Sequence, residues 1–158
     1  MSQQLVIYTD GAARGNPGPG GYGVVMQWGR VVRELSQGFR RTTNNRMELM
    51  AVVAALQSLT RERLDIVIYS DSSYVVNSVE KGWVHGWVKT GFKGKKNADL
   101  WMLYLQHHHK HKIKFVWVKG HADNVYNNRC DQLATAAADS GNWLIDKGYE
   151  EDTGGTLL

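Results

Sequence analysis

The chain has 158 residues, of which 42% are hydrophobic and 22% are charged, and its formal net charge is +4. These values fit one soluble domain with one core, and no apolar run reaches the length of a membrane span. The first residues, MSQQLVIYTD, do not have the pattern of a signal peptide, and the one cysteine, Cys130, excludes an internal disulfide. Together these features favour a cytoplasmic protein, and the absence of an unused apolar stripe favours a monomer.

Apolar runs and their spacing predict the secondary structure in chain order. A Gly- and Pro-rich stretch, DGAARGNPGPGGYG, predicts a loop after the first strand. The other elements follow from apolar runs or from apolar residues at helical spacing. The predicted elements are strands at 5–8, 22–28 and 31–39, a helix at 44–59 capped by Thr42 or Thr43, a strand at 66–69, a helix at 72–88 interrupted at Gly82 and Gly86, a helix at 99–109, a strand at 113–118, and a helix capped by Asn127 or Asn128 that runs to 138.

This order of elements predicts an α/β fold with a five-stranded mixed sheet. The first three strands are expected to form an antiparallel meander, and the later strands to run parallel to the first. Helices are expected on both faces of the sheet. Residues 1–142 would form a single domain, and residues 143–158 a partly disordered C-terminal tail.

Two similar strands each end at an aspartate. VIYTD ends at Asp10, and VIYSD ends at Asp71. If these strands lie side by side and parallel, both carboxylates emerge at the same edge of the sheet, where sites form in α/β folds. Taken alone, either aspartate is equally well explained as a turn residue.

Two further acids fall near the starts of predicted helices, Glu48 and Asp131. Each alone could simply complement a helix N-terminus. Four carboxylates at one edge would repel each other and raise at least one pKa, a conflict that divalent cations remove. Mg²⁺ suits oxygen ligands and phosphate substrates best, whereas no Cys/His set has zinc spacing. Two ions about 4 Å apart could activate water and stabilise a leaving oxygen in phosphodiester hydrolysis.

Positive charge is concentrated in one part of the chain. Between Lys81 and Lys119 the only acidic residue is Asp99, and lysines alternate with Trp83, Trp87 and other aromatic residues. We call residues 81–119 the basic block. It indicates a polyanionic partner such as nucleic acid, although charge alone also fits a solvated lysine face.

Five motifs in order resemble those of bacterial ribonuclease HI: YTDGAARGNPGPGGYG at 8–23, TTNNRMELMA at 42–51, YSDSSYV at 69–75, WVKGHA at 117–122 and NRCDQLA at 128–134. The resemblance spans residues 5 to about 138 and implies a ribonuclease H-like fold. It implies hydrolysis of the RNA strand of RNA–DNA hybrids to 5′-phosphate and 3′-hydroxyl ends. The catalytic residues would be Asp10, Glu48, Asp71 and Asp131, holding two Mg²⁺ ions or the substitute Mn²⁺, with His121 on a loop assisting proton transfer or product release.

The same resemblance implies a set of hybrid-binding residues. Amides at three positions would contact the backbone and the RNA 2′-hydroxyls, because an amide can both donate to and accept from a hydroxyl. Two further residues would grip a DNA phosphate, and Trp83, Trp87 and residues 89–96 would form a binding handle. The expected contacts are Asn16, Asn44 and Asn45 for the RNA strand, Thr43 and Asn97 for a DNA phosphate, Arg46 for phosphate or helix cover, Ser73 where the family commonly has Gln, and Trp83, Trp87, Lys89, Lys93, Lys95 and Lys96 in the handle.

Other functions remain open from the residues alone. One is a hybrid- or duplex-binding module of the same fold without catalysis, and another is a nuclease of that fold acting on DNA or double-stranded RNA. GNPGPGG lacks the Lys and Ser/Thr of a nucleotide P-loop. His107 and His111 are spaced as a metal pair but also suit a helix C-terminus, and Cys130 fits a packing role.

Overall fold

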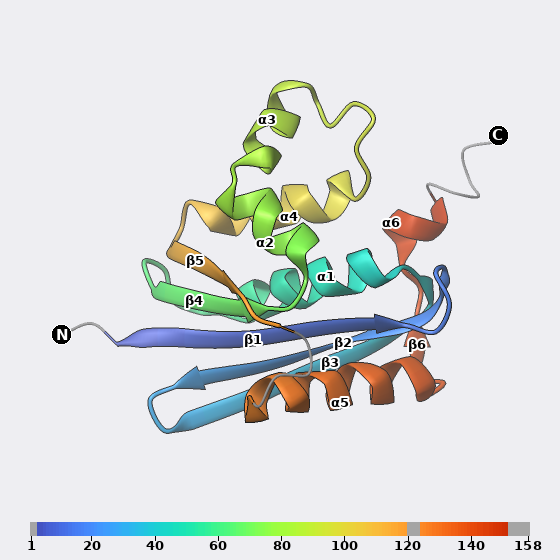
Figure 1. Cartoon of the computed structure of the whole chain (residues 1–158), viewed down its shortest axis with the longest axis horizontal. Helices are drawn as coiled ribbons and strands as arrows, with labels where there is room; N and C mark the ends of the chain where they lie inside the picture. Colours follow the sequence, from blue (N-terminus) through green and yellow to red (C-terminus); the bar gives the residue numbers. More distant parts are fainter. Residues whose placement is uncertain (1–2, 120–123, 152–158) are drawn as a thin grey trace.

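The computed structural model describes residues 3–119 and 124–151, and Figure 1 shows a mixed sheet with helices on both faces. Within these residues the sheet has six strands in the order β5-β4-β1-β2-β3-β6. β1, β2 and β3 form an antiparallel meander, whereas β4 runs parallel to β1 and β5 runs parallel to β4. The strands are β1 (Gln4–Ala13), β2 (Gly18–Trp28), β3 (Val31–Thr42), β4 (Asp65–Ser70), β5 (Lys112–Trp117) and β6 (Trp143–Leu144).

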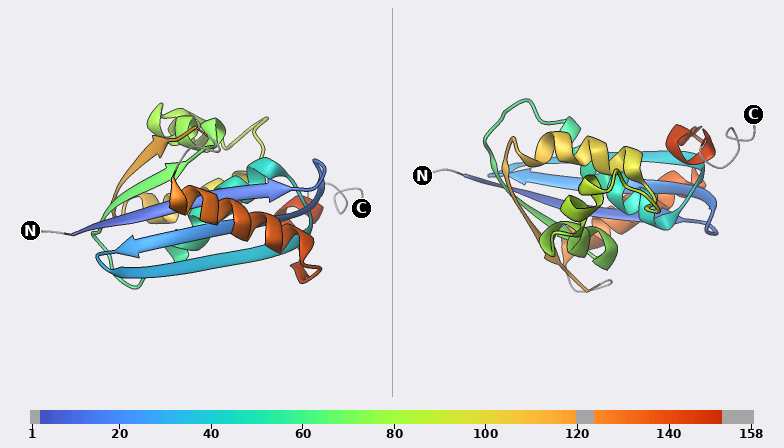
Figure 2. Two further views of the ribbon diagram at one scale, coloured as in Figure 1. Left: turned by 60° about the horizontal axis from the view of Figure 1, so that its bottom comes forward. Right: turned by 90° about the horizontal axis from the view of Figure 1, so that it is seen from above.

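Helices α1 to α4 lie over one face of the sheet and α5 lies along the other (Figures 1 and 2). Thr43 caps α1, since its hydroxyl accepts a hydrogen bond from the Arg46 N–H at 3.2 Å. The predicted helix at 72–88 is two helices, because Gly82 takes a left-handed conformation with φ of 76°. The helices are α1 (Asn44–Gln57), α2 (Ser73–Glu80), α3 (Trp83–Lys89), α4 (Ala98–His108), α5 (Val125–Asp139) and α6 (Lys147–Glu150).

The alternation of β1 divides the core between the two faces. Leu5 and Ile7 point into the larger core, which includes the buried Trp101 and Tyr104 of α4. Tyr8 points the other way and packs with Cys130 of α5 in a smaller cluster. Cys130 is therefore part of the packing between α5 and the sheet.

Glycines in the central strands let helices approach the sheet closely. A Cβ on Gly21 would lie 2.7 Å from the Ala134 carbonyl oxygen of α5, and a Cβ on Gly23 would overlap the Cys130 carbonyl oxygen. Such separations are shorter than real Cβ contacts, so a side chain at either position would push α5 away. The close approach brings α5, and with it Asp131, towards β1.

The predicted fold class is confirmed, with differences in detail. The sheet has six strands rather than five, because Trp143 and Leu144 pair with Gly38 and Phe39 of β3. The stretch predicted as a loop is largely strand: β1 extends to Ala13 and β2 begins at Gly18, since glycines that weaken a strand in isolation are held by the pairing of β1 with β2. α5 starts earlier than predicted, because the capping side chain is Asn124 and not Asn127 or Asn128.

The C-terminal segment expected to be a tail includes β6 and α6 in its described part, residues 143–151. Asp146 caps α6 and is itself buried. In the part of the chain that the structure describes, no helix is both long enough and apolar enough to cross a membrane.

Candidate active site

Three carboxylates from separate elements meet at one edge of the sheet. Asp10 lies in β1, Glu48 lies in the second turn of α1, and Asp71 follows the last residue of β4. One carboxylate oxygen from each can be chosen so that all three lie within 4.8 Å of one another. Among the described residues, no other group of three or more His, Cys, Asp or Glu side chains comes this close.

The register of two parallel strands places Asp10 beside Asp71. In the pairing of β1 with β4, Val6 lies opposite Val67 and Thr9 lies opposite Ser70. The similar runs VIYTD and VIYSD are therefore aligned residue for residue, so each aspartate follows the same step of the ladder. Asp71 thus follows the carboxyl end of β4, and Asp10 lies beside it in β1, which continues to Ala13 through its pairing with β2.

Glu48 is positioned by a close contact between α1 and β1. A Cβ on Gly11 would overlap the Glu48 backbone nitrogen, so glycine is required for this approach. The Gly11 N–H donates to Glu48 Oε1 at 2.8 Å and to Asp10 Oδ1 at 2.9 Å. One backbone donor thus holds an oxygen of each carboxylate.

Burial and mutual repulsion disfavour the ionised forms of Asp10 and Glu48. Burial raises the pKa of Asp10 to about 6, opposed by its hydrogen bond with Glu48 and reinforced by the charge of Asp71. Burial also raises the pKa of Glu48 well above its usual range, and the nearby Asp10 charge adds to this. Glu48 Oε2 is buried, and no donor within the described ranges reaches it. A hard cation between these oxygens would satisfy Oε2 and offset the repulsion, so the residues fit a divalent metal such as Mg²⁺.

Asp131 faces the same cavity from the other side of the sheet edge. A cavity of about 530 Å³ is lined by all four acids and by residues of α1, α2 and α5. Asp131 is outside the compact trio, but its charge contributes to the raised pKa of Asp10. The four predicted acids are thus brought to one cavity.

The amides expected to contact the RNA strand lie beside this cavity. Asn44 and Asn45, in the first turn of α1, line it directly. Asn16 is exposed in the turn between β1 and β2, and its Oδ1 accepts from the Asn44 N–H at 3.1 Å. Ser73 is exposed at the start of α2 and also lines the cavity.

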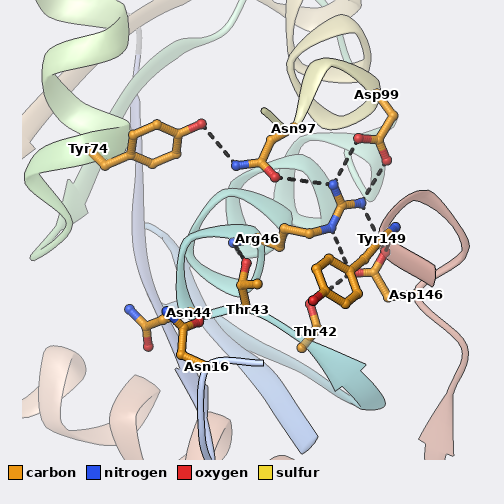
Figure 3. A network of polar contacts seen from close by, with 10 residues as sticks. All are labelled: Asn16, Thr42, Thr43, Asn44, Arg46, Tyr74, Asn97, Asp99, Asp146 and Tyr149. Carbon is orange, nitrogen blue, oxygen red and sulfur yellow. Dashed lines mark hydrogen bonds and ion pairs between the residues drawn. The ribbon is translucent and has the colours of Figure 1, made fainter. Parts of the chain in front are cut away.

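Arg46, expected either to meet phosphate or to cover its helix, is buried in a network of ion pairs. The whole residue is 3% exposed, and its guanidinium pairs with Asp99 of α4 and with Asp146 of the C-terminal segment, at 2.7 Å in each case (Figure 3). These hydrogen bonds raise the pKa of Arg46 despite the opposing effect of burial. Asp146 also accepts from the Thr42 hydroxyl at 2.7 Å. Arg46 therefore ties α1 to two other parts of the chain. Its contact with phosphate stays a prediction.

The same network holds Asn97, one of the two residues expected at a DNA phosphate. Asn97 Oδ1 accepts from Arg46 Nη1 at 3.3 Å, and Asn97 Nδ2 donates to the Tyr74 hydroxyl at 3.1 Å (Figure 3). Its backbone is left-handed, with φ of 66°. Thr43, the other residue, lies at the start of α1 with its hydroxyl oriented by the N-cap bond. Both side chains therefore accept a hydrogen bond from Arg46, Thr43 from its backbone N–H and Asn97 from its guanidinium.

The expected handle projects away from the sheet as α3 and the turns that follow it (Figure 1). Trp83 is 45% exposed, with the Lys81 ammonium 5.6 Å from its ring centre. Trp87 is more buried, packing against Trp101, and the Lys95 ammonium lies 5.4 Å from its ring. The handle lysines are all exposed: Lys89, Lys93, Lys95 and Lys96.

His121 lies outside the described residues. The histidines of the 107–111 run have other partners: His108 Nδ1 lies 2.8 Å from the Tyr104 hydroxyl, and His111 Nδ1 accepts from the Leu64 N–H at 3.2 Å. The Cys130 thiol donates to the Tyr8 carbonyl in the packed interior, and burial raises its pKa to about 12. These contacts favour the structural explanations for the histidine run and for the cysteine.

The sequence did not reveal two features of the site. Trp117 Nε1 donates to the Asp71 carbonyl oxygen at 3.1 Å, which fixes the backbone next to that carboxylate. Asn127 lines the cavity one helical turn before Asp131. The four-residue spacing between Asn127 and Asp131 was the available signal, since i and i+4 share a helix face.

Comparison with known proteins gives consistent results. Residues 2–139 match the family model described as RNase H. The chain is 50% identical over 149 residues to a protein named Ribonuclease H from Desulforamulus reducens, covering 91% of this chain and 93% of that one. It is 48% identical to a protein of the same name from Shewanella loihica, with 94% and 96% covered.

Solved structures show the same fold. LC9-RNase H1, described as a type 1 RNase H with the type 2 active-site motif, matches with a TM-score of 0.79 and 32% identity, over 98% of this chain and 82% of that chain. LC11-RNase H1, solved in complex with an RNA/DNA hybrid, matches with a TM-score of 0.60 and 25% identity, over 87% and 98%. Since the family model covers most of the chain and the relatives align over nearly their whole length, the chain belongs to the RNase H family.

Proposed function

We propose that this chain hydrolyses the RNA strand of RNA–DNA hybrids with two Mg²⁺ ions held by Asp10, Glu48, Asp71 and Asp131, leaving 5′-phosphate and 3′-hydroxyl ends. The observation that carries the proposal is the meeting of Asp10, Glu48 and Asp71 within 4.8 Å, at a cavity that Asp131 also lines. A relative of the same fold, LC11-RNase H1, is known in complex with an RNA/DNA hybrid.

The carboxylates would hold the metal ions and fix their position for this reaction. When bound, divalent cations at such a site activate water and stabilise the departing 3′-oxygen of a phosphodiester. Glu48 and Asp10 are held by the Gly11 N–H, so their remaining oxygens are already oriented. This preorganisation reduces the reorganisation that the reaction would otherwise require. Mn²⁺, which also takes oxygen ligands, would substitute for Mg²⁺.

Substrate recognition would use the residues around the cavity. The amides of Asn16, Asn44 and Asn45 suit the 2′-hydroxyls of the RNA strand, which distinguish RNA from DNA. Thr43 and Asn97 would bind a phosphate of the DNA strand, with Arg46 and Tyr74 holding Asn97 in place.

The exposed handle would bind the hybrid further from the cleavage point. Its four lysines, at positions 89, 93, 95 and 96, can neutralise phosphates, and the exposed face of Trp83 can pack against a sugar or base. Ser73 would contact the minor groove beside the cavity. His121 would assist proton transfer or product release, a role suited to imidazole near neutral pH. We infer that the protein acts as a cytoplasmic monomer, and gel filtration would test its oligomeric state.

A substrate panel tests the proposed function. Labelled RNA–DNA hybrid, double-stranded DNA and double-stranded RNA are incubated with the protein, with and without Mg²⁺. We expect cleavage of the RNA strand in the hybrid alone, and only with the metal. Hybrid binding without metal-dependent cleavage would indicate a non-catalytic module, and cleavage of double-stranded DNA would indicate a different nuclease.

One substitution links the activity to the carboxylates. Asp10→Asn should abolish cleavage while hybrid binding, measured by fluorescence anisotropy, stays close to that of the original chain. Asp139→Asn is the matched control, because Asp139 is exposed and pairs with Arg14 on the surface. An active Asp10→Asn protein would show that the metal assignment is wrong.

A further inference from the structure

Buried polar side-chain atoms without a hydrogen-bond partner are confined to two residues within the described ranges. They are Oε2 of Glu48, and both Oδ1 and Nδ2 of Asn127. Both residues line the cavity that holds the four acids. The unpaired oxygen of Glu48 is explained by the metal site, whereas the amide of Asn127 has no role in the site as described so far.

The amide of Asn127 is not needed to fold its helix. The N-terminus of α5 is capped by Asn124, whose Oδ1 accepts from the N–H groups of Tyr126 and Asn127 at 2.9 and 3.1 Å. The backbone of Asn127 is therefore already satisfied by a neighbour. Burying an amide without partners costs about 1–3 kcal/mol per group, so in the free protein the Asn127 side chain opposes stability.

Asn127 and Asp131 occupy one face of α5. They are four residues apart, a spacing that puts Cβ atoms about 5–6 Å from each other, and both line the cavity. The uncharged amide of Asn127 lies one helical turn before the carboxylate of Asp131. A group that enters beside Asp131 would therefore meet the amide.

We propose that Asn127 is a positioning residue of the metal site, whose amide holds a water molecule in the hydration shell of the cation bound by the carboxylates. Asn127 Nδ2 has no acceptor and Asn127 Oδ1 has no donor among the described residues, and a water molecule can serve as either. Mg²⁺ usually retains several waters, and an ordered water needs two to four polar partners. This inference rests on the metal binding of the proposed function and adds a residue to it.

The test separates metal binding from folding. Asn127→Leu keeps the branching and the number of side-chain heavy atoms but removes the amide, and Asn127→Asp keeps an acceptor. Asn124→Ala is the control in which a satisfied cap is lost. The melting temperature is measured without metal, and Mn²⁺ binding is measured by titration calorimetry without substrate. These readouts do not depend on catalytic activity.

The expected pattern sets the two asparagines apart. Asn124→Ala should lower the melting temperature, because two backbone donors lose their acceptor. Asn127→Leu should leave the metal-free melting temperature unchanged or raise it, yet weaken Mn²⁺ binding about tenfold, as loss of an outer-shell partner does. Asn127→Asp should bind Mn²⁺ at least as tightly as the original chain.

Two results would overturn the inference while leaving the proposed function intact: Asn127→Leu binding Mn²⁺ with unchanged affinity, or Asn127→Leu losing as much thermal stability as Asn124→Ala. Failure of the original chain to bind Mn²⁺ would instead remove the metal site itself, and the role of Asn127 with it.

Discussion

Replacing Asp10 with asparagine should stabilise the metal-free protein, increasingly so as the pH rises. Asp10 has a folded-state pKa of about 6 against an ordinary value of 3.8, because burial and the charge of Asp71 disfavour its ionised form. A carboxyl group with a raised folded pKa favours the folded state below its unfolded pKa, and this contribution is lost as the pH rises through the folded pKa. The asparagine side chain of the variant carries no charge at any of these pH values, so the variant escapes that loss.

The magnitude follows from the two pKa values. At about 1.36 kcal/mol for each pH unit between them, ionising Asp10 in the folded state costs about 3 kcal/mol at pH 8. At pH 4 most of this cost is absent, and the difference between the two proteins should be below about 1 kcal/mol. Removing the Asp10 charge also lowers the pKa of Glu48, which adds to the effect in the same direction.

Urea unfolding from pH 4 to pH 8 in the presence of a chelator would measure this difference. The free energy of unfolding of Asp10→Asn minus that of the original chain should grow by about 2–3 kcal/mol across this range. Comparing the two proteins at each pH cancels the contributions of titrating groups that Asp10 does not influence. Saturating Mg²⁺ should shrink the difference, because the cation binds the folded original chain more strongly. A difference that is constant with pH, or a variant less stable at pH 8, would refute the reasoning.

Three further predictions test the framework around the site. Asp146→Ala should lower the free energy of unfolding by about 3 kcal/mol, because it leaves Arg46 buried with one carboxylate fewer. Asp139→Ala, which breaks a surface ion pair, should cause no measurable change. Equal effects of the two substitutions in urea unfolding would contradict this. Gly23→Ala should lower the free energy of unfolding by about 2 kcal/mol or more and reduce cleavage, because the added Cβ displaces α5. Gly86→Ala, where a Cβ meets nothing, should instead stabilise the protein by about 0.5–1 kcal/mol in thermal unfolding. Hybrid affinity, measured by anisotropy between about 50 and 200 mM salt, should fall steeply if the basic block contacts phosphates, and a flat profile would exclude that mode of binding.

Local patterns were sufficient for much of the fold. Apolar runs located the strands, and the spacing of Leu49, Val52, Val53 and Leu56 located α1, whose buried face includes these residues. The paired runs ending at Asp10 and Asp71 predicted a shared edge of the sheet, because parallel neighbouring strands have a fixed register. Such signals depend on nearby residues, which is why they can be recognised in one sequence.

The sequence could not show which distant groups satisfy a buried charge. Arg46 was expected to meet phosphate or to cover its helix, but no pattern in the sequence indicated that its guanidinium is enclosed by Asp99 and by Asp146, which lies a hundred positions later in the chain. The sixth strand and the cap of α5 at Asn124 were also missed, since each depends on pairing or capping that competes with equally plausible local choices.

Residue types and their spacing along the chain were enough to indicate the family, to order the elements and to predict the four acids. The packing in three dimensions brings one carboxylate oxygen each of Asp10, Glu48 and Asp71 within 4.8 Å of one another and places Asp131 in the lining of the same cavity. It also buries the amide of Asn127 there without a hydrogen-bond partner among the described residues. The physical reason is that burial and electrostatic repulsion depend on distances between elements. The packing of helices against a sheet sets these distances, and no local pattern in the chain encodes them.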